Sequence, residues 1–174
     1  MELFARAFTR VVPQDWNEIL VTELPRIYNY FRYLGVDNTL AEDLTSITFL
    51  KAWRKRGTYR SERTAFTTWL LRIARNTAID FFRTRPTDLG LEAADNVQGG
   101  PSPEEIFLES EQTSRLRQML AALPQRDRQL IALKYGSELN NRTIAKVSGL
   151  SETNVGTILY RTIQMLREQW EVSR

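Results

Sequence analysis

The 174-residue chain contains neither cysteine nor histidine. These absences exclude disulfides, thiol nucleophiles, Cys/His zinc sites and any Ser-His-Asp triad. No apolar run approaches the ~20 residues that a membrane-spanning helix needs, and the N-terminal sequence lacks a signal-peptide core. We therefore expect a cytoplasmic protein that is not an enzyme, binds no cofactor or metal, and does not insert into a membrane.

Negative charge is concentrated in one segment of the chain. Residues 86–114 hold seven Asp or Glu and no Lys or Arg, whereas residues 1–85 and 115–174 each carry an excess of Lys and Arg. Proline and glycine recur at the start of the acidic segment, as is typical of a linker. The pattern predicts two basic modules that face nucleic acid, joined by an acidic tether. We place the first domain at 1–85, the flexible linker at 86–102 and the second domain at 103–174.

Apolar residues recur at helical spacing, and no stretch alternates apolar and polar residues over strand length, so we expect an all-α fold of two small helical domains. A first helix is predicted from Gln14 to Tyr33, interrupted or kinked near Pro25. A second is predicted to begin at Thr39, because Thr39 and Glu42 have capping-box spacing. The further helices are expected from Ala65 to about Arg83, from Ser102-Pro103 to near Pro124, and from Gln125 to Tyr135.

The segment from Asn141 to Arg167 has the pattern of a helix-turn-helix. Gly149 supplies a turn at positive φ, and Ser151 is placed to cap the helix that follows. Val155, Ile158 and Leu159 are spaced to face inward, which leaves the opposite side of this helix free. Such a helix can enter the major groove of DNA, although the same pattern also fits an ordinary hairpin in a helical bundle.

Three runs occur in a characteristic order across the acidic linker: AEDLTSITFLKAW, TWLLRIARNTAIDFFR, and ALPQRDRQLIALKY followed by the helix-turn-helix. In this order and at these separations they resemble the extracytoplasmic-function sigma factors of bacteria. The resemblance covers about 160 residues. It implies an initiation subunit that binds core RNA polymerase, through the β′ coiled coil and the β flap, and directs it to promoter DNA. It also implies control by an anti-sigma factor.

The resemblance implies that the first domain binds polymerase and opens the −10 element. The residues implied for polymerase contact are Glu42, Asp43, Ile47 and Leu50. Extracting a base from the stack costs a few kcal/mol, which aromatic stacking, amides that read base edges and phosphate-binding Arg can recover. The residues implied for the −10 element are Tyr59, Arg72, Arg75, Asn76, Asp80 and Arg83. Trp69 is expected in the core instead, because its neighbours are apolar.

The second domain is implied to read the −35 element as duplex DNA. The residues implied are Ser151, Asn154, Gly156, Thr157, Tyr160 and Arg161. Arg161 is the strongest candidate, because a guanidinium suits both phosphate and guanine. Gly156 lowers helix stability by about 1 kcal/mol relative to alanine, so we interpret it as permitting close approach of the backbone to DNA.

Two other functions remain open at this point. A helix-turn-helix repressor would need an effector pocket or a dimerising helix in its first half, where this chain has the polymerase-like runs instead. A sigma-like decoy would bind an anti-sigma factor without using DNA, which the few cations of the recognition helix allow. The acidic linker either threads through the polymerase or serves only as a solvated tether.

Overall fold

The computed structural model describes residues 16–84 and 111–172, and all regular elements in these ranges are helical, as predicted. Residues 16–84, called the first half below, contain α2 (Trp16–Tyr33), α3 (Asn38–Lys55), the short turn η1 (Arg56–Thr58) and α4 (Phe66–Arg83). Residues 111–172, the second half, contain α6 (Glu111–Ala121), α7 (Gln125–Ile131), the π-helical turn η3 (Ala132–Gly136), α8 (Asn141–Ser148) and α9 (Glu152–Val172). The predicted linker at 86–102 and the predicted helix start at Ser102-Pro103 lie outside the described residues.

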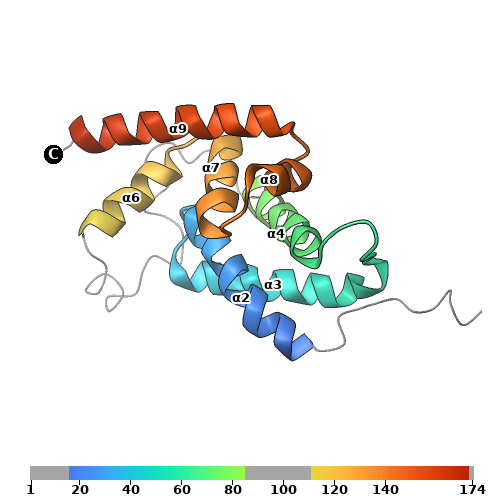
Figure 1. Ribbon diagram of the computed structural model, residues 1–174. Coiled ribbons are helices and arrows are strands. Elements are labelled where there is room, and N and C mark those ends of the chain that lie inside the picture. Colours follow the sequence, from blue (N-terminus) through green and yellow to red (C-terminus); the bar gives the residue numbers. More distant parts are fainter. Residues whose placement is uncertain (1–15, 85–110, 173–174) are drawn as a thin grey trace, which may run out of the picture.

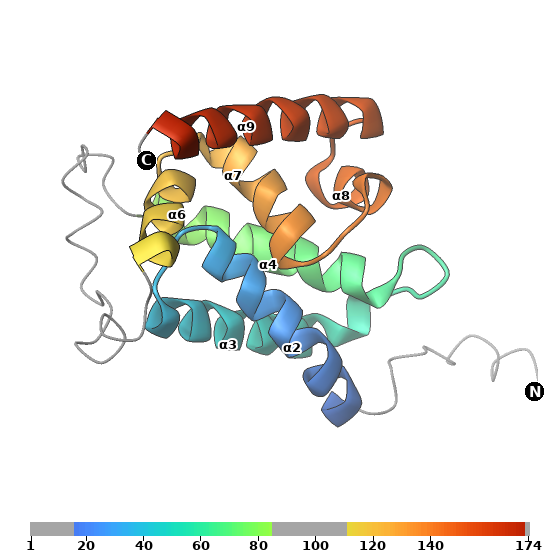
Figure 2. The same cartoon turned by 60° about the vertical axis from the view of Figure 1, so that its left-hand side comes forward.

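The helices form one body with two exposed edges. In Figures 1 and 2, α9 runs along one edge and α3 lies toward the opposite edge, with α4, α7 and α8 between them, while α2 crosses α3 and its N-terminal end projects beyond it. The second half packs directly on the first: η3 lies against α2, and α8 lies against α4. Among the described helices, none is both long enough and apolar enough to cross a bilayer.

Two local predictions in the first half need correction. The N-cap of α3 is Asp37 rather than Thr39, and the Asp37 carboxylate accepts a hydrogen bond from the backbone N–H of Leu40 at 2.8 Å. A carboxylate at the N-cap satisfies an orphan N–H and also suits the helix dipole. Pro25 does not interrupt the first helix, since α2 continues through it to Tyr33.

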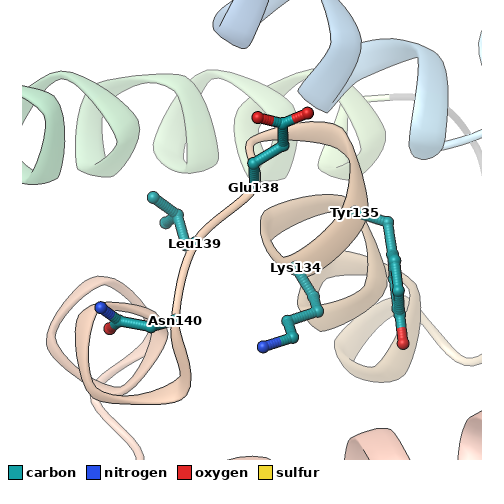
Figure 3. Close-up of a pocket in the computed structure, with 5 residues that line it drawn as sticks. All are labelled: Lys134, Tyr135, Glu138, Leu139 and Asn140. Carbon is teal, nitrogen blue, oxygen red and sulfur yellow. The ribbon is translucent and has the colours of Figure 1, made fainter.

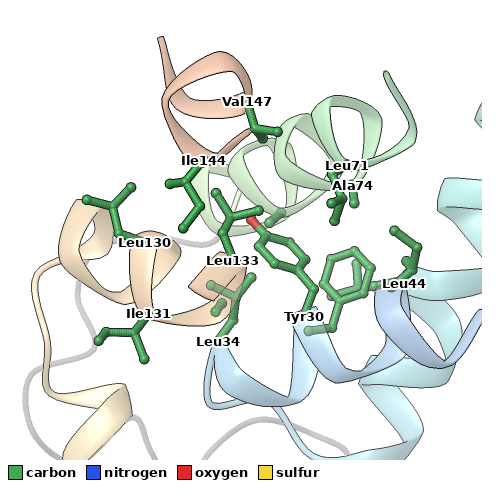
Figure 4. Close-up of a cluster of buried hydrophobic side chains, with 14 of the residues drawn as sticks. Tyr30, Leu34, Leu44, Leu71, Ala74, Leu130, Ile131, Leu133, Ile144 and Val147 are labelled. Atoms are coloured by element: carbon green, nitrogen blue, oxygen red, sulfur yellow. The ribbon is translucent and has the colours of Figure 1, made fainter. Parts of the chain in front are cut away.

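A single cluster of buried apolar side chains joins the two halves. Tyr30 and Leu71 of the first half are fully buried, as are Leu133 and Ile144 of the second half. Figure 4 shows these side chains converging between α2, α4, η3 and α8. Each half therefore buries part of its apolar surface against the other.

Candidate nucleic-acid interface

The helix-turn-helix is confirmed, and its local interactions follow from the sequence. The Asn140 side chain caps α8 by accepting a hydrogen bond from the Thr143 N–H at 2.9 Å. Gly149 ends α8 with φ of +79°, in the left-handed region that glycine adopts without steric cost. The Ser151 hydroxyl then accepts from the Asn154 N–H at 3.2 Å at the start of α9. These contacts fix how α9 leaves the turn.

One side of α9 is buried and the other is free. Val155, Ile158 and Leu159 pack into the core, as their spacing predicted. The predicted −35 residues, called the recognition face below, lie on the other side: Ser151, Asn154, Thr157, Tyr160 and Arg161 are exposed, and Gly156 is half-buried. The Tyr160 side chain is 68% exposed, although it is large and aromatic. The recognition face is thus exposed to solvent and is not used in packing within the described residues.

The predicted −10 residues on α4 have partners within the protein. The Arg72 guanidinium donates to the backbone carbonyl of Lys146 through Nε at 3.2 Å and through Nη2 at 2.7 Å. Arg75 Nε donates to the side-chain oxygen of Gln129 at 3.2 Å. Both acceptors belong to the second half, so these two arginines face the other half of the protein rather than open solvent alone. Sequence reasoning did not anticipate these partners.

The end of α4 carries a network of charged side chains. Asp80 pairs with Arg83 at 3.1 Å and with Lys51 of α3 at 3.7 Å. Lys51 was not among the predicted site residues, because it lies outside the α4 run. Asn76 is exposed on α4, where its amide can both donate and accept hydrogen bonds. Asp80, four residues after Asn76 on α4, thereby holds one cation from α4 and one from α3.

Tyr59 is only 8% exposed, because it belongs to an aromatic cluster. Its ring lies 5.3 Å from that of Phe66 and 5.4 Å from that of Trp69, centroid to centroid. Burial raises the pKa of the Tyr59 hydroxyl, and the nearby Glu62 carboxylate raises it further. Trp69 is half-buried against the core, in line with its apolar neighbours. A base that stacked on Tyr59 would have to share its ring with these two partners.

The predicted polymerase-binding residues form an exposed stripe on α3. Asp43, Ile47 and Leu50 are spaced four and three residues apart, so they share one helix face, and Glu42 lies beside them. All four are exposed, which is unusual for Ile47 and Leu50. Trp53 is also exposed on α3, beneath the Arg56 guanidinium at 4.1 Å from its ring centroid. The stripe therefore combines two carboxylates with exposed apolar area on one side of α3.

An open concavity lies where η3 leads into α8 (Figure 3). Its lining residues are Lys134, Tyr135, Glu138, Leu139 and Asn140. In Figure 3 the Glu138 carboxylate points away from the side on which the Lys134 and Tyr135 polar ends lie. Among the described residues, no three Asp or Glu side chains gather as metal ligands would.

Comparison with known proteins places both halves in one family. The family model for Sigma-70 region 2 matches residues 20–86, and that for Sigma-70, region 4 matches residues 113–166. The chain is 31% identical over 143 residues to the ECF RNA polymerase sigma factor BldN of Streptomyces coelicolor, covering 80% of this chain and 54% of BldN. It is 30% identical over 140 residues to the ECF RNA polymerase sigma factor SigW of Bacillus subtilis, covering 74% of each. The chain thus spans about half the length of BldN and about three-quarters of that of SigW.

Two solved structures share the fold across both halves. The structure of CnrH in complex with the cytosolic domain of CnrY matches 90% of this chain and 88% of CnrH, at 20% identity and a TM-score of 0.68. The sigma factor RpoE in complex with the anti-sigma factor NepR from Bartonella quintana matches 92% of this chain and 99% of RpoE, at 24% identity and a TM-score of 0.70. With the two sigma regions matched in order along its length, the chain belongs to the extracytoplasmic-function RNA polymerase sigma factors.

Proposed function

We propose that this protein is a transcription initiation factor that binds core RNA polymerase and directs it to the −35 and −10 elements of its promoters. The observation that carries the proposal is the free recognition face of α9, held by a capped helix-turn-helix in a chain that also has an exposed stripe on α3. One face serves DNA and the other serves the polymerase. Binding, rather than chemistry on a substrate, is the proposed activity, and its place is the cytoplasm.

The recognition face reads the −35 element as duplex. Arg161 is exposed and takes part in none of the ion pairs of the described residues, so its guanidinium is available to a phosphate or a guanine. Asn154 and Ser151 lie at the N-terminus of α9, where the helix dipole favours a phosphate. Thr157 and Tyr160 extend the same face along the groove.

The face of α4 reads the −10 element once it is single-stranded. Asn76 offers a donor and an acceptor to one base edge, while Arg72 and Arg75 suit the backbone phosphates on either side. Asp80 holds Arg83 and Lys51, which makes it a residue that positions cations rather than one that binds phosphate itself. Tyr59 stacks on the extracted base from its place beside Phe66 and Trp69.

The α3 stripe docks on the β′ coiled coil of core polymerase, and the second half contacts the β flap. Asp43 and Glu42 supply carboxylates to basic partner residues, while Ile47 and Leu50 supply apolar area that is exposed in the chain alone. An anti-sigma factor is the expected inhibitor, because RpoE, which shares this fold, was solved in complex with one.

The test is transcription in vitro with bacterial core polymerase. Promoter fragments are first selected from the source genome by the reconstituted holoenzyme, and run-off transcripts are then measured from them. A repressor would bind the fragments without polymerase, and a decoy would yield no transcript. Either result would overturn the proposal.

Two variants separate the DNA contacts from polymerase binding. Arg161→Ala should weaken binding to −35 duplex by about 1–3 kcal/mol and leave co-elution with core polymerase unchanged. Asn76→Ala should reduce promoter opening, measured by permanganate reactivity of unpaired thymines, more than it reduces closed-complex binding. Equal loss of polymerase and DNA binding in Arg161→Ala, or unchanged opening in Asn76→Ala, contradicts the assigned roles.

A further inference from the structure

The second half contacts two of the residues assigned to single-stranded DNA, Arg72 and Arg75, while Asn76 stays exposed. The carbonyl of Lys146 in α8 accepts both hydrogen bonds from Arg72, and Gln129 in α7 accepts one from Arg75. Arg128 of α7 also lies over the ring of Phe82, with its guanidinium carbon 5.3 Å from the centroid. Contacts from α7 and α8 therefore run along α4 beside the residues that would hold phosphates.

The contact between η3 and α2 leaves no room for a side chain at Gly136. A methyl group built at Gly136 would lie 2.7 Å from the backbone oxygen of Asn29 and 3.1 Å from Cδ2 of Tyr33. Both neighbours belong to α2 in the first half. Gly136 has no positive φ, so alanine fits its local backbone and would clash only across the contact between the halves. Gly136 thus permits the two halves to close.

The same arrangement cannot bind both promoter elements at once. The positions that give the −35 and −10 elements their names are about 25 base pairs apart, which is roughly 85 Å of duplex at ~3.4 Å per base pair. A compact chain of this length has a radius of gyration of only about 16 Å. The two halves must separate before each can reach its own element.

We propose that this chain inhibits itself: its second half closes over the first, with Gly136 against α2, and occupies Arg72 and Arg75 until polymerase or DNA separates them. This inference rests on the proposed function, since it assigns those arginines to DNA. The inhibitor is part of the same chain, so the closed state forms without a partner protein.

DNA phosphates can displace the acceptors that hold Arg72 and Arg75 in the closed state. The acceptors for Arg72 and Arg75 are a backbone carbonyl and an amide, both neutral. A hydrogen bond from guanidinium to phosphate is roughly twice as strong as one between neutral groups, and it is stronger than one to a neutral acceptor. DNA phosphates therefore compete well for both arginines once the halves begin to part.

The buried hydroxyl of Tyr30 makes the closed state less stable than it could be. The Tyr30 ring points from α2 into the space between Leu133, Ile144 and α4 (Figure 4), and it is fully buried. Among the described residues, none accepts a hydrogen bond from its hydroxyl. Because separation of the halves would return this hydroxyl to water, Tyr30→Phe should favour the closed state, opposite to a substitution at Gly136.

The first experiment measures closure in the full-length chain. Since the chain has no cysteine, spin labels can be attached at Thr39→Cys in α3 and Glu168→Cys in α9, both exposed positions. The parent should give one narrow distance distribution. Gly136→Ala should shift it to longer and broader distances, with helix content by circular dichroism unchanged. Gly156→Ala is the control for the distance measurement only, because a methyl group there would meet only the Asn141 side chain, at 3.5 Å.

The second experiment measures release of the arginines, with a fluorescein-labelled dT oligonucleotide that tests phosphate binding without a promoter sequence. Gly136→Ala should bind it at least about fivefold more tightly than the parent, because the binding-competent fraction rises. Adding Arg72→Ala to Gly136→Ala should remove most of that gain. Tyr30→Phe should bind about twofold or more weakly than the parent.

The outcomes distinguish self-inhibition from the proposed function. A broad, long distance distribution in the parent, or unchanged distances in Gly136→Ala, would overturn the proposal. So would longer distances with no gain in oligonucleotide binding, or a gain that survives Arg72→Ala. If distances and oligonucleotide binding respond as expected but no promoter supports transcription, closure stands and the initiation function fails.

Discussion

At the scale of single residues, Gly136 and Gly156 differ in what a side chain would meet. A methyl group at Gly136 would collide with α2, whereas at Gly156 it would find ordinary contact with Asn141 at 3.5 Å. Nothing in the described part of the protein therefore requires glycine at position 156. Its place in the middle of the recognition face suggests that the requirement comes from DNA, whose backbone can approach a glycine more closely than any other residue.

Gly156→Ala tests this interpretation. The substitution should stabilise the chain by about 1 kcal/mol, because alanine has the higher helix propensity. It should also weaken binding to −35 duplex, because the new methyl group enters the space that the DNA would occupy. Thermal unfolding and fluorescence anisotropy measure the two effects. A variant that is more stable and binds duplex as tightly as the parent would show that the glycine has no role at the DNA surface.

At the scale of helices, α3 separates stability from binding. Leu50 is 49% exposed, so Leu50→Ala should change the free energy of unfolding by less than about 0.5 kcal/mol. If the α3 stripe docks on polymerase, the same change should weaken core binding by more than about 1 kcal/mol, since buried apolar anchors dominate interfaces. The matched control is Val172→Ala, which truncates an exposed apolar residue on α9. Equal affinities for core polymerase in the two variants would contradict docking through α3.

The sequence predicts the helices and turns correctly where residues close together in the chain determine the local structure. The turn at Gly149, the cap at Ser151 and the buried side of α9 all follow from residues within a few positions of one another. The start of α3 was misplaced because Asp37 and Thr39 are both good N-caps, and the choice depends on how the chain leaves α2. The π-helical turn η3 was missed, since its Ser137 N–H to Ala132 C=O bond has no signature in the hydrophobic pattern.

The candidate site was predictable only in part, for a similar reason. Helical periodicity is enough to place the recognition face in solvent. It does not do so for the α3 stripe, because Ile47 and Leu50 share the apolar spacing of buried Leu44, and only the resemblance assigned them to an exposed surface. The partners of Arg72 and Arg75 lie 74 and 54 residues away along the chain, and no periodicity encodes such contacts. Tyr59 likewise fitted an aromatic beside an extracted base, but Phe66 and Trp69 bury most of its ring. Whether it stacks on a base stays a prediction.

At the scale of the whole molecule, the buried cluster explains why two modules form one body. The apolar faces of α2 and α4 were predictable as core, yet the sequence does not say which helices cover them. In the structure η3 and α8 do so. Separating the halves would expose residues such as Leu71 and Leu133, which are fully buried when closed. The closed state is therefore held mainly by apolar burial, with polar contacts at its margin.

Salt should distinguish this apolar closure from an electrostatic one. The ion pairs that the structure describes each lie within one half, as Lys51–Asp80 does, and both halves carry more Lys and Arg than Asp and Glu. Added salt therefore screens repulsion between the halves and breaks no attraction between them. Raising NaCl from about 0.05 M to about 0.5 M should leave the distance between labels at positions 39 and 168 unchanged or narrow its distribution. Over the same range, binding to the dT oligonucleotide should weaken by more than tenfold, because each neutralised phosphate releases counterions. Distances that lengthen with salt would mean that charge attraction, rather than the buried cluster around Tyr30, holds the halves together.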